Sequence, residues 1–471
     1  MAPAFHIENF GCRAARADGE AVAERLLAAG LCECEPSLAD VVVVNTCSVT
    51  AEADRSARAF IRRAHRQNPD ARIVVTGCYA QRAPEELAGL GGVVAVVGNS
   101  HKAMAPEIAA NLARGTASRA ASGPDGLIPV AALMRAPIWA DDRFAHSFLE
   151  EAQVLPGAQT RPNLKIQEGC GNRCTFCVIP QTRGGSQSLA VDAVMRQVEG
   201  FVAGGGRELV LSGINLGRWG RDLGKLSLAS LVHRIFRETE LARLRLSSIE
   251  PMDWDAELID LMREFCGTRL ARHAHLPLQS GSDAVLRRMH RRYRPWHYAG
   301  KVSALVDAAG PELTLGTDVM VGFPGESDRE FEETLEFIRA LPFGYLHLFP
   351  FSPRPGTPGW AMHLQTSVAA GAVAERMAAL RALAGDKTEV HRRQFVGQEL
   401  DAITLNPPPA LQVQRRTLAL TDNFLPVEID GVVAANRLVR VKIVGLDADL
   451  TLQAWVAESH AGEEPAMASS A

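Results

Sequence analysis

The stretch Gly169-Cys170-Gly171-Asn172-Arg173-Cys174-Thr175-Phe176-Cys177 places three cysteines close together, directly after the apolar strand candidate LKIQ at 164–167. Three thiolates at this spacing can ligate three irons of a cubane cluster, which leaves the fourth iron open to another ligand. A structural zinc site normally has four protein ligands, and no fourth cysteine or histidine follows nearby. Zinc is therefore the weaker alternative, and the triplet predicts an iron–sulfur centre after a strand.

The strand before this triplet is the first of a series separated by stretches of helical period. Six such βα units predict a partial (β/α)6 barrel over residues 161–391, with its active site at the carboxyl ends of the strands. The strand candidates are LKIQ (164–167), ELVLS (208–212), RLRLS (243–247), RHAHL (272–276), LTLGTDVMV (313–321) and YLHLF (345–349).

Residues 1–112 alternate β-branched runs with helical stretches, which predicts an α/β fold with a doubly wound parallel sheet. Cys12, Cys47 and Cys78 each follow a strand candidate directly, in FGC, NTC and TGC. Ligands gather at the carboxyl ends of strands in such sheets. Because a core cysteine has no reason to recur at the same junction, we interpret the three as a second ligand set rather than as buried packing.

The remaining segments differ in composition. Residues 113–160 are rich in Gly, Ala, Ser and Pro and are expected to form a linker with one helix near 142–151. Residues 392–458 contain the short strand candidates ELDAITL, TLALT, LPVEID and LVRVKIVGL, which predict a small β-barrel of a kind that often binds nucleic acid. Residues 459–471 are expected to be a disordered tail.

Composition narrows the function classes. The 471 residues are 47% hydrophobic and 22% charged, with a net charge of −4, which predicts a folded protein and excludes a globally basic nucleic-acid binder. Nine cysteines, an odd number, and no secretory pattern at the amino terminus predict a reducing, cytoplasmic location. No apolar run approaches the roughly 18 to 20 residues that cross a bilayer, so no membrane partner is expected.

The segment KIQEGCGNRCTFCVIPQTRG closely resembles the radical S-adenosylmethionine motif, with flanks similar to the methylthiotransferase family, and the likeness runs from Gly11 to about Glu458. It implies a [4Fe–4S] cluster on Cys170, Cys174 and Cys177 whose open iron binds S-adenosylmethionine and yields a 5′-deoxyadenosyl radical. A second [4Fe–4S] cluster on the residues Cys12, Cys47 and Cys78 is also implied. Inserting sulfur into a C–H bond needs a sulfur donor besides a radical generator, which agrees with two clusters.

The resemblance further implies that S-adenosylmethionine contacts residues following successive barrel strands, although a turn or cap is an equally good reading of any single one. The candidates are Gly213, Asn215, Ser248, Glu250, Gln279 and Asp318.

Local charge supplies a candidate RNA surface in RRMHRRYR, just past the fourth strand of the barrel. Its arginines suit a phosphate-contacting rim beside the active site, while an ordinary solvated surface is the alternative. They are Arg287, Arg288, Arg291, Arg292 and Arg294.

NTCSVTAEADRSAR at 45–58 and GCYAQ at 77–81 resemble the branch that modifies C2 of N6-threonylcarbamoyladenosine 37 in the tRNA anticodon loop. Arg13-Ala14-Ala15-Arg16 departs from the family's Lys-Val-Asn-Gln. The resemblance implies a reducing partner such as flavodoxin or ferredoxin and a sulfur donor. Alternatives are the branches acting on N6-isopentenyladenosine 37 of tRNA or on a ribosomal-protein aspartate, and a non-catalytic iron–sulfur protein for RNA binding or electron transfer.

Overall fold

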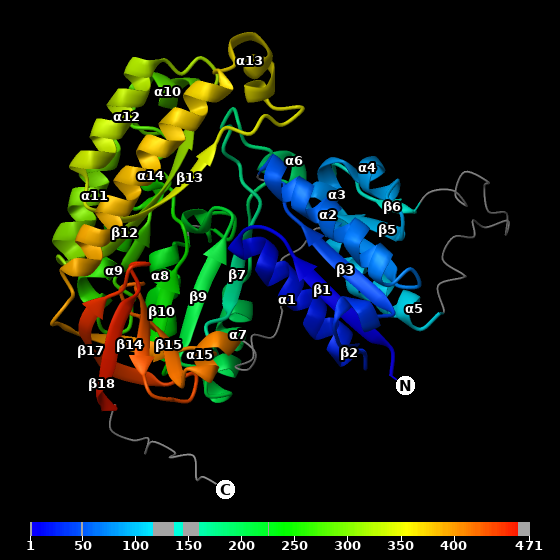
Figure 1. The fold of residues 1–471 in the computed structure, drawn as a ribbon, viewed down its shortest axis with the longest axis horizontal. Helices are drawn as coiled ribbons and strands as arrows, with labels where there is room; N and C mark the ends of the chain where they lie inside the picture. Colours follow the sequence, from blue (N-terminus) through cyan, green and yellow to red (C-terminus); the bar gives the residue numbers. More distant parts are fainter. Residues whose placement is uncertain (1, 49, 116–135, 145–159, 225, 460–471) are drawn as a thin grey trace, which may run out of the picture.

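The computed structural model describes residues 2–48, 50–115, 136–144, 160–224 and 226–459, which form three folded parts (Figure 1). An N-terminal α/β domain lies beside a central open barrel, and a small β-barrel lies at one end of that central part. Within these residues, no helix is long and apolar enough to span a bilayer. The helix expected near 142–151 and the tail after 459 fall mostly outside the described residues.

The N-terminal domain contains a six-stranded, all-parallel sheet in the order β2-β1-β3-β4-β5-β6. Helices α1 and α5 pack on one face and α2 and α4 on the other, so the predicted doubly wound sheet is confirmed. The strands are β1 (Ala4–Asn9), β2 (Cys32–Glu33), β3 (Val41–Thr46), β4 (Arg72–Gly77), β5 (Val93–Gly98) and β6 (Ile138–Trp139), and the helices are α1 (Arg13–Ala28), α2 (Ala51–Gln67), α3 (Cys78–Arg82), α4 (Pro84–Ala88) and α5 (Ala105–Ala113).

Strand β6 corrects one expectation. It lies within the segment 113–160, which composition assigned to a linker, but it pairs with β5 through Val96 and Val97 and extends the sheet. The segment Ile138-Trp139 is too short to give a periodic signal. Its strand conformation depends on pairing with β5, which is distant in the sequence. The N-terminal domain therefore recruits a strand from beyond residue 112.

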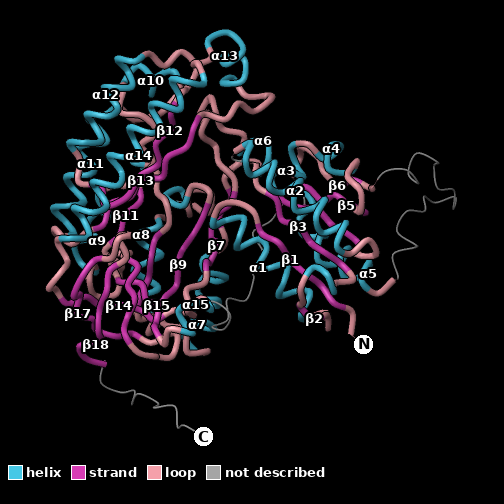
Figure 2. Tube along the Cα trace, viewed as in Figure 1, coloured by secondary structure: helices cyan, strands magenta, loops and turns pink. Residues whose placement is uncertain are grey.

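All six strands expected in the centre are present and parallel. Together with β8, a short seventh strand antiparallel to β7, they form two sheets, β10-β9-β7-β8 and β11-β12-β13, with a parallel bridge between Leu244 and Leu270 near their junction, and helices pack outside them (Figure 2). The strands are β7 (Asn163–Glu168), β8 (Gln187–Ser188), β9 (Glu208–Gly213), β10 (Arg243–Leu246), β11 (His273–His275), β12 (Thr314–Val321) and β13 (Phe343–Pro350); the helices are α6 (Ile179–Arg183), α7 (Val191–Ala203), α8 (Leu228–Glu238), α9 (Ala256–Phe265), α10 (Asp283–Arg288), α11 (Pro295–Ala309), α12 (Asp328–Ala340), α13 (Pro358–Thr366) and α14 (Ala370–Arg393).

Helix α8 illustrates why these segments are helical. Ser227 caps its first turn by accepting a hydrogen bond from the Ser230 backbone N–H. Its apolar residues recur every three or four positions, so they share one face and bury it in the central core. The buried side chains are Leu228, Leu231, Val232, Ile235 and Phe236.

The C-terminal part is a closed barrel in the order β14-β15-β16-β18-β17, as predicted, with β18 as a fifth strand that sequence patterning did not identify. It packs on the amino-terminal ends of the central strands, where Arg272 pairs with Asp422 and Asn436 donates to the Gly205 carbonyl. It is therefore far from the strand ends that carry the cysteines. The elements are β14 (Glu399–Thr404), α15 (Pro409–Val413), β15 (Arg416–Thr421), β16 (Pro426–Asp430), β17 (Leu438–Leu446) and β18 (Leu452–Ser459).

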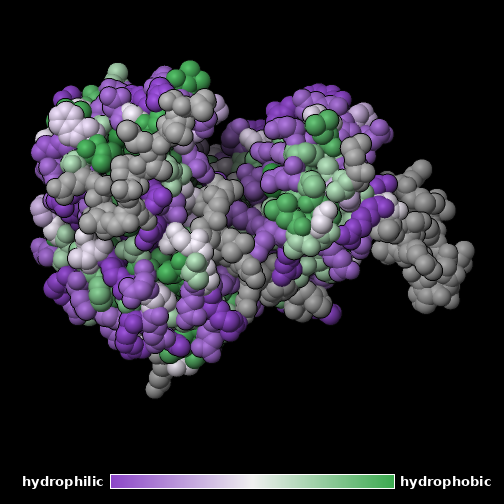
Figure 3. Space-filling model, turned by 90° about the horizontal axis from the view of Figure 1, so that it is seen from below, coloured by the Kyte–Doolittle hydropathy of each residue, from purple (hydrophilic) through white to green (hydrophobic). Residues whose placement is uncertain are grey.

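The surface seen from below is largely hydrophilic on the N-terminal domain and on the rest of the molecule, with hydrophobic residues in small patches (Figure 3).

Charged side chains are also buried in the interior. Glu208, at the start of β9, is fully buried and accepts hydrogen bonds from Arg245 at 3.0 Å and Arg243 at 3.4 Å. Burial alone would raise the pKa of Glu208, but Arg245, Arg243 and Arg161 outweigh it and lower that pKa from 4.5 to about 2.

This depressed pKa predicts an acid-dependent loss of stability. Glu208 stabilises the fold fully above pH 4.5, and the contribution, roughly 3 kcal/mol, is lost as the pH falls through about 2. Urea unfolding of the wild type and of Glu208→Gln should therefore differ by about that amount at pH 7, begin to converge as the pH falls below 4.5, and meet only near pH 2. A gap between the two curves that stays constant from pH 7 to pH 3 would contradict the assignment.

Candidate cluster and cofactor site

The loop carrying Cys170, Cys174 and Cys177 follows β7 at the carboxyl end of the central strands, where the sequence predicted it. Three N–H groups point at these sulfurs. The Asn172 backbone N–H lies 3.4 Å and Asn215 Nδ2 3.7 Å from the Sγ of Cys170, and an Arg291 guanidinium nitrogen lies 3.3 Å from that of Cys174. Hydrogen bonds to cluster sulfurs are a main way in which a protein sets the cluster's potential.

The donor set fits a [4Fe–4S] cluster with one open iron. Burial raises the pKa of the Cys177 thiol to about 12 and also raises that of Cys170, so these sulfurs are thiols until a metal displaces their protons. Among the described cysteines, Cys266 lies at the end of α9 and the rest lie in the N-terminal domain. Among the described residues, this loop therefore offers three soft ligands and no fourth thiol.

The second set of cysteines occupies neighbouring strand ends. Cys12 follows β1, Cys47 follows β3 and Cys78 begins α3 directly after β4. Gly11, at φ +110°, lies so close to Cys47 that a Cβ there would stand 2.5 Å from the Cys47 Sγ. The strand order reverses between β1 and β3, which is where ligands bind in doubly wound sheets.

Close packing at Gly11 leads to a test. Gly11→Ala should push Cys47 out of position, because a Cβ at 2.5 Å overlaps its sulfur. After anaerobic reconstitution the variant is expected to hold about half the wild-type iron, since only the first site can assemble. Gly30→Ala is the matched control, because Gly30 also has a positive φ, of +82°, but its Cβ would meet nothing within 4 Å. Full iron in Gly11→Ala would show that Cys47 is not a ligand.

Arg183 connects the two cysteine sites. It ends α6, a short helix that begins two residues after Cys177, and its Nε donates to the Cys78 Sγ at 3.1 Å. Asn99 Nδ2 lies 3.4 Å from the same sulfur and also donates to the Thr182 carbonyl at 2.8 Å. The segment that leaves the first site therefore supplies hydrogen bonds to the second.

A buried ionic network anchors this connection. Arg183 donates to Glu168 at 2.7 Å and lies 3.0 Å from Asp18, while Lys102 and Lys165 contact the same two carboxylates. Their side chains are at most 9% exposed. Three cations and two anions leave one net positive charge beside Cys78, which complements a site with three thiolate ligands.

The pKa shifts in the network follow from its packing. Burial would raise the pKa of Glu168, but Arg183, Lys102 and Lys165 hold it well below its usual range. Burial would lower the pKa of Arg183, which Cys78 and the carboxylates raise well above its ordinary value. Both groups are therefore charged at neutral pH, and Arg183 is a permanent cation beside the second site.

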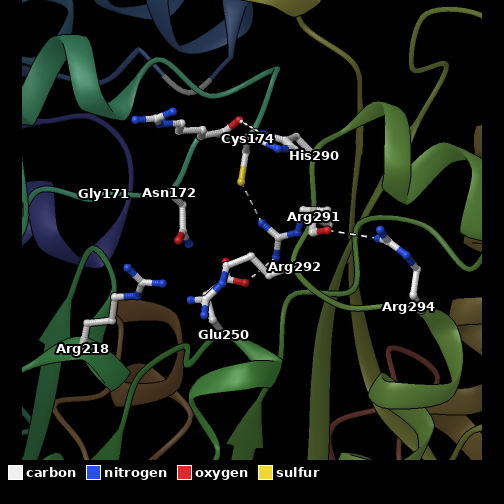
Figure 4. A pocket seen from close by; sticks show the side chains of 10 residues that line it. Gly171, Asn172, Cys174, Arg218, Glu250, His290, Arg291, Arg292 and Arg294 are labelled. Atoms are coloured by element: carbon white, nitrogen blue, oxygen red, sulfur yellow. Dashed lines mark hydrogen bonds and ion pairs between the residues drawn. The ribbon is translucent and has the colours of Figure 1, made fainter.

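The first cysteine loop also lines a cavity of about 440 Å³ (Figure 4). Arg291 lies across it, with one terminal guanidinium nitrogen directed at the Cys174 Sγ and the other 2.6 Å from a carboxylate oxygen of Glu250. Arg218 and Arg292 complete a basic lining. Anionic groups of a cofactor or of RNA are the ligands that this lining suits.

The predicted cofactor residues divide into two groups. Gly213 and Asn215 follow β9 near Cys170, Glu250 lines the 440 Å³ cavity, and Ser248 is exposed between β10 and that residue. Gln279 and Asp318 instead line a second cavity, of about 370 Å³, which also reaches Cys177. The six residues therefore surround the cysteine loop without forming one pocket.

The predicted RNA-contacting arginines have different surroundings. Arg291 is 6% exposed and is held by Cys174 and Glu250. Arg287 and Arg294 pair with Asp283, and Arg288 pairs with Glu330. Arg292 is exposed at the rim of the 440 Å³ cavity.

Comparisons with known proteins find two family models and several relatives that match most of this chain. Residues 4–98 match the model described as uncharacterized protein family UPF0004, and residues 164–338 match the radical SAM superfamily. The threonylcarbamoyladenosine tRNA methylthiotransferases MtaB of Bacillus subtilis and Aquifex aeolicus are 35% and 34% identical, over 94% and 93% of this chain and 93% and 99% of their own. A tRNA-2-methylthio-N(6)-dimethylallyladenosine synthase of a Parafrankia species is 33% identical over 85% of this chain and 77% of its own.

Among solved structures, the radical S-adenosylmethionine methyltransferase TsrM from Kitasatospora setae covers 76% of this chain and 75% of its own, with a TM-score of 0.55 and 15% identity, a likeness of fold. The relatives that match nearly end to end carry the family assignment. This chain belongs to the radical S-adenosylmethionine methylthiotransferase family, in the MtaB branch.

Proposed function

We propose that this chain attaches a methylthio group to C2 of N6-threonylcarbamoyladenosine 37 in tRNA, giving the 2-methylthio nucleoside. The MtaB relatives, which match over most of their length, support the reaction and the tRNA substrate. The observation that carries the proposal is the pair of three-cysteine sites at the strand ends of two domains, joined by the Arg183 contact to Cys78. One site alone would suffice for radical generation but not for sulfur insertion.

The two cysteine sites have different proposed roles in the reaction. S-adenosylmethionine on a reduced [4Fe–4S] cluster supplies a 5′-deoxyadenosyl radical, the species able to abstract an unactivated hydrogen atom. Cys170, Cys174 and Cys177 would hold that cluster, and the N–H groups directed at their sulfurs would set its potential. The N-terminal trio, Cys12, Cys47 and Cys78, would hold the second cluster and carry the transferred sulfur.

We assign S-adenosylmethionine to the side of the loop with Asn215, Ser248 and Glu250, which lie at the ends of β9 and β10. We further propose that Arg292 and its neighbours in RRMHRRYR contact tRNA phosphates at the rim. The reaction consumes electrons and sulfur, so a reducing protein such as flavodoxin or ferredoxin and a sulfur donor are proposed partners. We also propose a cytoplasmic location, because tRNA is the proposed substrate.

Reaction of the reconstituted protein with defined tRNA tests this proposal. Anaerobic protein, S-adenosylmethionine, sulfide and dithionite are incubated separately with tRNA bearing threonylcarbamoyladenosine and with tRNA bearing dimethylallyladenosine, and the digested nucleosides are analysed by mass spectrometry. We expect the 2-methylthio nucleoside together with 5′-deoxyadenosine. Product only from tRNA bearing dimethylallyladenosine would overturn the substrate assignment, and 5′-deoxyadenosine without any methylthio nucleoside would overturn the reaction.

A further inference from the structure

The 370 Å³ cavity lies where the two cysteine-bearing parts meet. Cys177 borders it on one side, and Thr50, the cap of α2, borders it on the other. The Ala51 backbone N–H donates to Ser352 Oγ at 3.0 Å and holds the two domains together at this edge. A group bound in this cavity is therefore close to the radical-forming loop and to the N-terminal domain at once.

The walls of this cavity suit a flat aromatic ring with a polar substituent. Phe176, Phe349 and Phe351 supply aromatic surface, on which a purine base stacks favourably. Asp318, His347 and Arg354 supply the charged or titratable groups. Such a mixture recognises a base that carries polar atoms of its own.

Arg354 is a buried cation with unused donors. It is 4% exposed and places one guanidinium nitrogen 2.5 Å from Asp54, a carboxylate that Arg82 also contacts at 2.8 Å. Two guanidinium groups thus share one carboxylate, which leaves a positive charge. The Nε and the second terminal nitrogen of Arg354 have no hydrogen-bond partner among the described residues. Buried donors of this kind call for an acceptor, and a carboxylate offers the best match to a guanidinium fork.

His347 is the second polar side chain of the cavity that can bind a ligand. Its Nδ1 lies 3.2 Å from Asp318, which also contacts His275 at 3.1 Å. His275 is buried and fixed by Tyr345, whose hydroxyl lies 2.9 Å from its Nδ1, whereas the His347 side chain is 62% exposed. Because Nδ1 of His347 is hydrogen-bonded to Asp318, Nε2 is the ring nitrogen that can bind a ligand.

We propose that this cavity receives the N6-threonylcarbamoyl group of the target adenosine, with Arg354 binding its carboxylate and His347 Nε2 binding its hydroxyl or carbamoyl oxygen. The inference rests on the proposed function and adds the residues that select its substrate. A dimethylallyl group, which has no polar atoms, would fill the cavity but leave the Arg354 donors unpaired. Discrimination against a substrate that leaves buried donors unpaired is typically strong.

Affinity measurements on RNA hairpins separate recognition from folding. The reconstituted holoprotein is titrated with two anticodon hairpins, one with threonylcarbamoyladenosine and one with unmodified adenosine at the target position. The wild type should bind the modified hairpin at least about tenfold more tightly, and His347→Phe should reduce that ratio to roughly two- or threefold. Its affinity for the unmodified hairpin should not change, whereas a folding defect would weaken both. Arg354→Gln should lower the ratio similarly.

His233→Phe, an exposed histidine on α8, is the matched control and should keep the wild-type ratio. An unchanged ratio in both His347→Phe and Arg354→Gln would overturn the inference while leaving the methylthiotransferase activity of the wild type intact. His275, Asp318 and His347 also have ligand atoms within 4.8 Å of one another. If the protein holds a divalent metal that His347→Gln loses, these residues form a metal site and the inference is also wrong.

Discussion

Cys78→Ala and Cys174→Ala are expected to abolish methylthiolation completely, but by different routes. Cys78→Ala removes a ligand of the second site, so reconstituted protein should hold about four of roughly eight irons and still release 5′-deoxyadenosine. Cys174→Ala should also retain about four irons but release no 5′-deoxyadenosine, because the open iron that binds S-adenosylmethionine is lost. The two variants therefore have equal iron and opposite cleavage activity, measured by iron assay and liquid chromatography.

Cys32→Ala serves as the control, since Cys32 is exposed in β2 and belongs to neither trio. It should retain full iron and full product. If Cys78→Ala kept all its iron, or if it still formed the 2-methylthio nucleoside, the N-terminal cysteines would not form a second cluster with a part in sulfur insertion.

Arg183→Gln is expected to destabilise the protein by about 3–5 kcal/mol, because it removes a fully buried cation from between Asp18 and Glu168. It also removes the hydrogen bond to Cys78 and the net positive charge of the network. The potential of the second cluster should fall, since a positive charge nearby stabilises the reduced, more negative cluster. Urea unfolding and an anaerobic redox titration followed by electron paramagnetic resonance measure the two effects.

A double variant separates stability from the contact with sulfur. Arg183→Gln combined with Glu168→Gln removes the carboxylate left without its guanidinium partner and restores the wild-type net charge of the network, so part of the lost stability should return. The hydrogen bond to Cys78 is still lost, so the part of the fall in potential that is due to net charge should be recovered and the part that is due to the hydrogen bond should remain. Full recovery of the potential in the double variant would show that Arg183 acts on the cluster through the net charge of the network and not through its contact with Cys78.

The parts of the fold that sequence predicted well depend on short-range pattern. All six central strands appear where β-branched and apolar runs placed them, and Cys12, Cys47 and Cys78 follow β1, β3 and β4. A strand and the residue after it are fixed by local sequence, and parallel pairing then brings strand ends to one edge. The cysteine trios were therefore predictable, whereas the two-residue strand β6 was not.

The residues that connect the sites were not predictable, because their roles depend on partners far along the chain. Arg183 lies in the quoted motif PQTRG, yet its contact with Cys78 spans more than a hundred residues. Lys102 and Asp18 are far apart in the sequence and are buried together with Glu168. Arg291 was grouped with rim arginines, but its side chain points at Cys174. A run of arginines carries no signal that distinguishes a surface cation from one directed inward.

The most direct test of the central claim is nucleoside mass spectrometry of total tRNA from a strain lacking this gene. Loss of 2-methylthio-N6-threonylcarbamoyladenosine, accumulation of its precursor without the methylthio group, and restoration by the wild-type gene but not by Cys78→Ala are the predicted results. Persistence of the threonylcarbamoyl product while a 2-methylthio derivative of dimethylallyladenosine disappears, or no change in any methylthio nucleoside, would contradict the proposed reaction.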